Sequence, residues 1–162
     1  MIVPFDPMRP ALAEADVLAA CRGRVVETSF REWRGKGWLG PSHPDGPRLH
    51  QKGRPRLAYT VHDAARVVVA VEFFCACGSG AVACAAVADE QVQAHIRGIL
   101  DIASRDGGVD YDCPDFPRFL LFQHVPIEAD EPGAAPVLIG VVPADALIDR
   151  LIREPPAVVA DL

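Results

Sequence analysis

The stretch FFCACGSGAVACAA, from Phe73 to Ala86, holds three of the five cysteines of the chain and a Gly-Ser pair between two apolar runs. Gly78-Ser79 is typical of a two-residue β-hairpin turn, with glycine at the first central position. If residues 66–77 form a strand, its period of two places six side chains on one face, and nearly all of them are apolar: Val67, Val69, Val71, Phe73, Cys75 and Cys77. We therefore expect a hairpin in which residues 81–88 form the return strand.

The sequence on either side of this hairpin predicts further strands and helices. Strands are expected at residues 24–33, 56–63, 118–125 and 137–142. Helices are expected at residues 11–23 after Pro10, at 90–105 after an Asp89 cap, and at 143–152. A chain of 162 residues suits one domain. We predict a single α+β domain over residues 1–162, with an antiparallel sheet of hairpins packed by two or three helices.

Charge is unevenly distributed along the chain. The formal net charge is -6, but residues 22–56 hold nine basic and three acidic residues, a balance of +6 that leaves -12 for the remainder. Within this segment, residues 34–56 are crowded with Gly and Pro, which predicts a long extended basic arm. The expected partner-binding residues of the arm are Trp33, Arg34, Lys36, Trp38, Arg48, Lys52, Arg54 and Arg56.

The cysteines of the quoted stretch are candidate metal ligands. Thiolates and imidazoles are the usual ligands of zinc, and two residues on one strand face near a hairpin tip can point at the same ion. Cys75 and Cys77 meet that condition, and His95 and Cys113 further along the chain would complete a site. A hairpin followed by a helix that carries a ligand is similar in outline to treble-clef zinc modules. Cys84 would lie about 13 Å from the level of Cys77 along the hairpin, so we expect it to pack in the core. Cys75 and Cys77 are in line with Val67, Val69 and Val71, so the alternative to a metal site is that all three cysteines are buried core residues.

The same residues allow a catalytic alternative. The run from Ala76 to Ala81, ACGSGA, resembles the second cysteine motif of the diaminopimelate epimerase and proline racemase family. The resemblance implies that Cys77 acts as a base on the α-carbon of an amino acid, with Gly78 to Gly80 donating to the substrate carboxylate. The matching cysteine motif of the other half of that family is missing, and one thiol cannot perform a two-base reaction.

The composition argues against a membrane protein and against a disulfide-bonded secreted protein. No run approaches the roughly 20 apolar residues of a membrane helix, and prolines interrupt the N-terminal residues, so we expect a cytoplasmic protein without a membrane partner. Five clustered cysteines favour reduced thiols or metal ligation over disulfides.

The functional hypothesis is a non-catalytic interaction subunit of a larger protein assembly, with a structural zinc and with the basic arm reaching over neighbouring subunits. Small head or tail connector subunits of a bacteriophage virion look similar in size and in α+β composition. Arginine interleaved with Phe30, Trp33 and Trp38 could also contact phosphates and stack on bases. A nucleic-acid-binding protein is therefore the alternative, and an epimerase-like enzyme is the remote one.

Overall fold

The computed structural model of the chain describes residues 6–43, 48–51, 54–105, 117–123, 137–153 and 158–161. Its helices are α1 (Glu14–Ala20), α2 (Glu27–Gly35), α3 (Val61–Cys77), α4 (Gly80–Ala88), α5 (Glu90–Arg105) and α6 (Ala144–Arg153). Its strands are β1 (Arg48–Gln51), β2 (Arg54–Leu57), β3 (Pro117–Gln123), β4 (Val137–Pro143) and β5 (Val158–Asp161). The predicted α+β class is confirmed.

The central element is α3, which begins at a capping box. The Thr60 hydroxyl accepts a hydrogen bond from the Asp63 amide, and Asp63 Oδ2 accepts one from the Thr60 amide, each at 2.9 Å. The helix ends at Gly78, whose φ of 72° is the left-handed conformation that glycine adopts without strain. Ser79 then caps α4, because its hydroxyl accepts from the Val82 amide at 3.4 Å.

The predicted hairpin of residues 66–88 is therefore wrong, since both of its strands are helices. Neighbouring positions such as Val69, Ala70 and Val71 are all buried on α3, so the helix is enclosed on most sides. A helix that is apolar all round lacks the one-sided pattern of a surface helix, and alternating residues then match a strand equally well. Gly78 caps the C-terminal end of α3 and Ser79 caps the N-terminal end of α4, so the pair joins two helices.

The strand predicted at residues 24–33 is also wrong. Residues 27–35 form α2, in which Phe30 and Trp33 lie three positions apart on the buried face. The strand predicted at residues 56–63 is reduced to the end of β2 and an isolated bridge between Tyr59 and Leu12. Three predicted helices are present: α1 lies within residues 11–23, α5 matches residues 90–105, and α6 matches residues 143–152. Two predicted strands are present as well, because β3 overlaps residues 118–125 and β4 overlaps residues 137–142.

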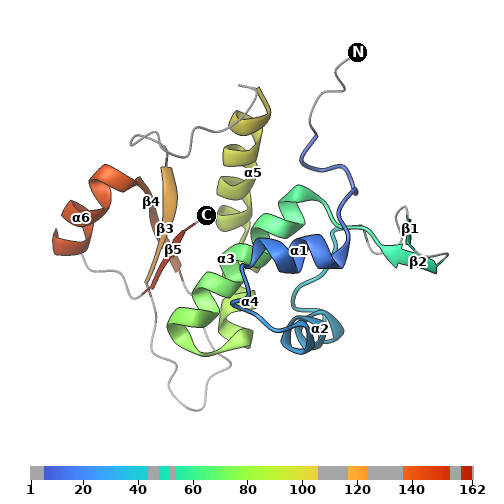
Figure 1. Cartoon of the computed structure of the whole chain (residues 1–162). Coiled ribbons are helices and arrows are strands. Elements are labelled where there is room, and N and C mark those ends of the chain that lie inside the picture. The colour runs from blue at the N-terminus through green and yellow to red at the C-terminus, as the bar shows by residue number, and fades with distance from the viewer. Residues whose placement is uncertain are drawn as a thin grey trace.

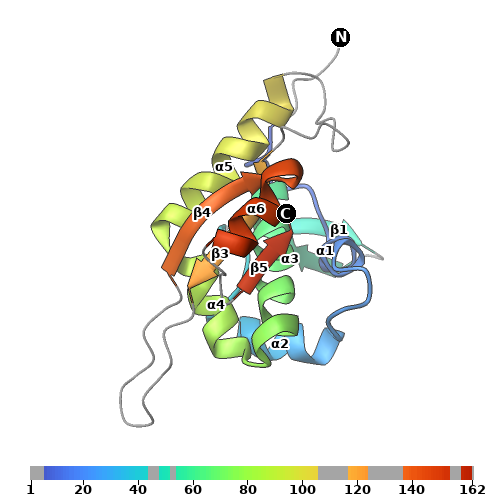
Figure 2. The same ribbon diagram turned by 90° about the vertical axis from the view of Figure 1, so that its left-hand side faces the viewer.

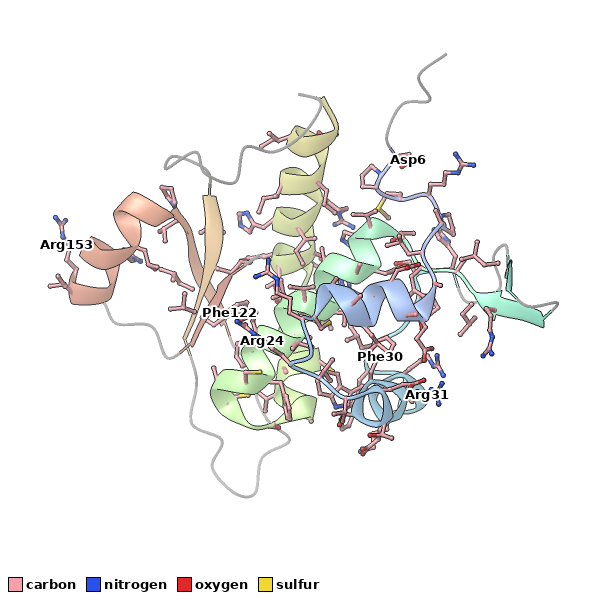
Figure 3. The ribbon with its side chains drawn as sticks, in the orientation of Figure 1. Asp6, Arg24, Phe30, Arg31, Phe122 and Arg153 are labelled. Carbon is pink, nitrogen blue, oxygen red and sulfur yellow. The ribbon has the colours of Figure 1, made fainter. Side chains whose placement is uncertain are left out.

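The larger sheet lies between two helical layers. Its strand order is β4-β3-β5, and both pairings are antiparallel. Figure 1 shows α6 on one side of this sheet and α3 and α5 on the other, and Figure 2 shows α6 in front of the strands. Phe122 is directed from β3 toward the helices, where its ring meets that of Phe73 edge to face at 5.0 Å (Figure 3). The contact joins α3 and the sheet in one core.

The second sheet is a hairpin of β1 and β2 alone. Figure 1 shows it on the opposite side of the helical layer from α6, at the edge of the molecule. Its base is anchored because Leu57 packs against the core and Tyr59 exchanges backbone hydrogen bonds of 2.9 Å with Leu12. Among the described helices and strands, β1 and β2 make their substantial contacts only with each other.

Among the described residues, no helix is long and apolar enough to cross a membrane.

Candidate functional site

The proposed zinc ligands do not meet in the way the sequence suggested. Cys75 and Cys77 lie in the last turn of α3, where residues two positions apart point about 200° away from each other. Cys75 is exposed, whereas Cys77 is half-buried and accepts a hydrogen bond from the Ser79 amide at 3.5 Å. His95 is exposed on α5, and Cys113 lies outside the described residues. No three potential metal ligands come together within the described part of the chain.

The remaining described cysteines are core residues. Cys84 on α4 is 2 % exposed, in agreement with the packing role expected from the sequence, and Cys21 after α1 is 3 % exposed. Burial raises the pKa of each thiol to about 11. Both thiols are therefore protonated and unreactive near neutral pH.

The glycines expected to cradle a substrate carboxylate have a packing role. A Cβ on Gly80 would lie 2.4 Å from Nε1 of Trp33, so the indole occupies the space beside the start of α4. The Trp33 ring also meets Phe74 edge to face at 5.3 Å. Gly80 is thus required for the contact between α2 and α4.

The first residues of the predicted arm belong to the body of the protein. Trp33 is 4 % exposed, and Phe30 is fully buried, so neither ring is available to stack on a base. Arg34 pairs with Glu14 of α1 and donates to the Tyr59 hydroxyl at 3.4 Å. Lys36 pairs with Glu32 and lies 4.5 Å from the centre of the Trp38 ring. Residues 34–43 are tied to the body through the ion pair of Arg34, the buried side chain of Leu39 and the hydrogen bonds of Ser42 with Asp63, while the extended arm over residues 34–56 stays a prediction.

What remains of the predicted arm is the hairpin of β1 and β2. Its register pairs Arg48 with Leu57, Leu49 with Arg56, His50 with Pro55 and Gln51 with Arg54. Arg56 is exposed, and within the described part of the chain it forms no ion pair. Lys52 lies outside the described residues. The hairpin is the basic element that projects from the body, and it is the candidate site.

A buried polar cluster at the start of α3 was not foreseen from the sequence. The Asp63 carboxylate is 1 % exposed and accepts hydrogen bonds from the Thr60 amide and from the amide and hydroxyl of Ser42. Asp63 thereby fixes the chain after α2 to the beginning of α3, close to the base of the hairpin. The Thr-x-x-Asp spacing of a capping box was the available signal.

His62 in the same cluster is 2 % exposed, and neither ring nitrogen has a hydrogen-bond partner within the described residues. Burial lowers its pKa, and the positive charge of Arg66 lowers it further. The imidazole is therefore neutral in the folded protein at neutral pH.

Comparison of the chain with family models, with curated proteins and with solved structures gives no match. The function has to be argued from the residues and their geometry. The bacteriophage origin, the cytoplasmic location and the zinc stay predictions.

Proposed function

We propose that the chain is a non-catalytic structural subunit of a larger protein assembly, and that the hairpin of β1 and β2 is the part that contacts a neighbouring protein. The supporting observation is the isolation of this hairpin. Each strand has four residues, and among the described elements its substantial contacts are with the other strand. A two-stranded hairpin of this size is marginally stable in water by itself. A partner that covers it would supply the missing stabilisation.

The base of the hairpin supports the same role. Leu57 and the backbone pairing of Leu12 with Tyr59 tie its lower end to the core, and Asp63 fixes the adjoining chain. An element that is anchored at its base can present a defined surface without refolding of the body. Loops and extensions held on a rigid scaffold are common sites of binding.

Nucleic acid is the weaker alternative as a partner. The basic residues of the hairpin suit phosphate contacts, but stacking platforms are needed for single strands and two of the three aromatic rings that were expected to supply them are buried. Only Trp38 of the three is exposed, at 37 %.

Limited trypsin digestion of dilute protein tests the proposal. Trypsin can cut after Arg48, Lys52 and Arg56, while Arg54 precedes a proline. We expect cuts in residues 48–57 at least about tenfold faster than cuts after Arg66 in α3 or Arg97 in α5, because the hairpin opens locally without unfolding of the core. A hairpin that resists trypsin as well as α3 does, in a sample with the mass of one chain, would contradict the proposed role.

A further inference from the structure

We infer that protonation of His62 opens the first turn of α3 and thereby releases the base of the hairpin. The inference rests on the proposed function and names an acid-sensitive control of the same surface. Its basis is a buried imidazole that lies among the contacts holding the hairpin to the body.

The hairpin joins the body at the first turn of α3. The end of β2 and Thr60, the cap of α3, are three residues apart. Between them, Tyr59 exchanges backbone hydrogen bonds of 2.9 Å with Leu12. The Thr60 amide donates to Asp63 Oδ2 at 2.9 Å. The hairpin is therefore held by the same turn of helix that carries His62.

Two further segments of the chain are bonded to this turn. In the N-terminal segment, the carbonyl of Pro7 accepts a hydrogen bond from the His62 amide at 3.1 Å. In the segment after α2, the Ser42 amide donates to Asp63 Oδ1 at 3.0 Å. These bonds end on the first turn, whereas the buried valines of α3 lie at least one turn further along the helix. The first turn can thus open while the core stays packed.

The imidazole of His62 is buried in this junction without a polar partner. The residue is 2 % exposed, and neither ring nitrogen has a hydrogen-bond partner among the described residues. The charges of Asp63 and Arg66 on α3 and of Arg97 on α5 act on the ring, so two cations oppose one carboxylate. Cys84 of α4 interacts with Arg66, but its thiol is protonated at neutral pH. Burial, followed by the charge of Arg66, lowers the pKa of the ring.

The closed junction disfavours a proton on His62. Its one carboxylate, that of Asp63, already accepts hydrogen bonds from the Thr60 amide and from the amide and hydroxyl of Ser42. An open first turn exposes the ring to water, where its pKa returns to about 6.5. The closed turn is therefore fully favoured above pH 6.5. Below that pH it loses up to about tenfold per pH unit relative to the open turn, until the pH reaches the pKa of the closed state.

Opening of the first turn removes the support of the hairpin. The pairing of Leu12 with Tyr59 and the bond of Ser42 to Asp63 both depend on the position of this turn. A two-stranded hairpin that has lost these contacts is marginally stable in water. The proposed contact surface is thus ordered at neutral pH and is lost in acid.

Amide hydrogen exchange of the intact chain at pH 7.5 and pH 5.5 tests this inference. Peptide mass spectrometry follows residues 58–64 and residues 69–74, and each rate is divided by the intrinsic rate at the same pH to give a protection factor. The wild type is compared with His62→Gln and with His62→Leu. The matched control is His43→Gln, at an exposed histidine beside Ser42. Far-UV circular dichroism at pH 7.5 shows whether each variant is folded.

In the wild type we expect the protection of residues 58–64 to fall about three- to tenfold from pH 7.5 to pH 5.5. At both pH values it should be at least about tenfold lower than that of residues 69–74, because the first turn opens without the core. Both His62 variants should keep the protection of residues 58–64 within about twofold between the two pH values, whatever their overall stability. His43→Gln should respond to pH as the wild type does.

Three results would overturn the inference: a smaller fall than this in the wild type, the wild-type fall retained in both His62 variants, or equal protection of residues 58–64 and 69–74 at pH 5.5, which would mean that only the whole molecule opens. A first turn that ignores acid, in a single chain whose hairpin is cut rapidly by trypsin, would reject the acid control while leaving the interaction role intact. A single chain with a trypsin-resistant hairpin at pH 7.5 would reject the proposed function whether or not the turn responds to acid.

Discussion

Gly80 shows how one missing side chain holds two helices together. The Trp33 indole lies where a Cβ of residue 80 would be, at 2.4 Å from Nε1. Gly80→Ala should therefore destabilise the protein by about 1–3 kcal/mol, because the indole or α4 must shift within a packed core. Urea denaturation measures the change. Gly98→Ala is the matched control, since a Cβ there meets no atom within 4 Å and alanine favours the helix, with a gain of up to about 1 kcal/mol. Equal effects at the two sites would mean that the contact with Trp33 is absent.

His62 makes the fold sensitive to acid. Burial lowers its pKa, and the positive charges of Arg66 on α3 and Arg97 on α5 act in the same direction, while the negative charge of Asp63 opposes them. The folded pKa lies below the unfolded value of about 6.5. The contribution of neutral His62 to the free energy of unfolding is therefore fully present above pH 6.5, and it is lost as the pH drops toward the folded pKa.

The expected loss from His62 is up to about 1.4 kcal/mol per pH unit below pH 6.5. Urea titrations at pH 7.5, 6.5 and 5.5 measure it. His62→Gln should flatten this slope, and His62→Leu provides a second variant if glutamine does not fold. His95→Gln, at an exposed position on α5, should leave the slope unchanged. A wild-type slope retained in both His62 variants would contradict the assignment.

At the scale of elements, the cysteines distinguish the observed helices from the predicted hairpin. Cys75 is exposed, whereas Cys21 and Cys84 are buried and have pKa values of about 11. Alkylation at pH 7.5 followed by peptide mass spectrometry should label Cys75 at least about a hundredfold faster than Cys21 and Cys84. In a regular hairpin, Cys75, Cys77 and Cys84 would share one face and react alike. Similar rates at Cys75 and Cys84 would thus count against the helices α3 and α4.

The elements that were predicted correctly have a clear local signal. α5 begins after Asp89, whose Oδ1 accepts from the amides of Gln91 and Val92 at 2.9 and 3.3 Å, as a cap should. β3 and β4 are apolar runs bounded by turn residues, and α6 has a strongly one-sided apolar pattern.

The helices α3 and α4 were predicted wrongly as strands because their burial in the core hides the helical pattern. α3 is enclosed on most sides, so its periodicity carries little information, and Gly78-Ser79 suits a pair of helix caps as well as a turn. The candidate site was located only coarsely. The basic charge of residues 48–57 was visible in the sequence, but the burial of Trp33 and the pairing of Arg34 with Glu14 depend on the packing of α1 against α2.

At the scale of the whole molecule, a helical layer lies between a three-stranded sheet and a small basic hairpin (Figure 1). The sheet shares its core with α3, so both should resist local opening. Among the described elements, the hairpin has no such cover, so its amides should be less protected than those of α3 and of the three-stranded sheet. Its stability should therefore depend on a partner, whereas that of the core should not.

Amide hydrogen exchange of the intact chain at 1 μM, followed by peptide mass spectrometry, tests this account most directly. We predict that residues 48–57 exchange at least about a hundredfold faster than α3 in this sample, because the hairpin opens locally while the core stays folded. Exchange of residues 48–57 that is as slow as that of α3 in the dilute, single-chain sample would contradict it.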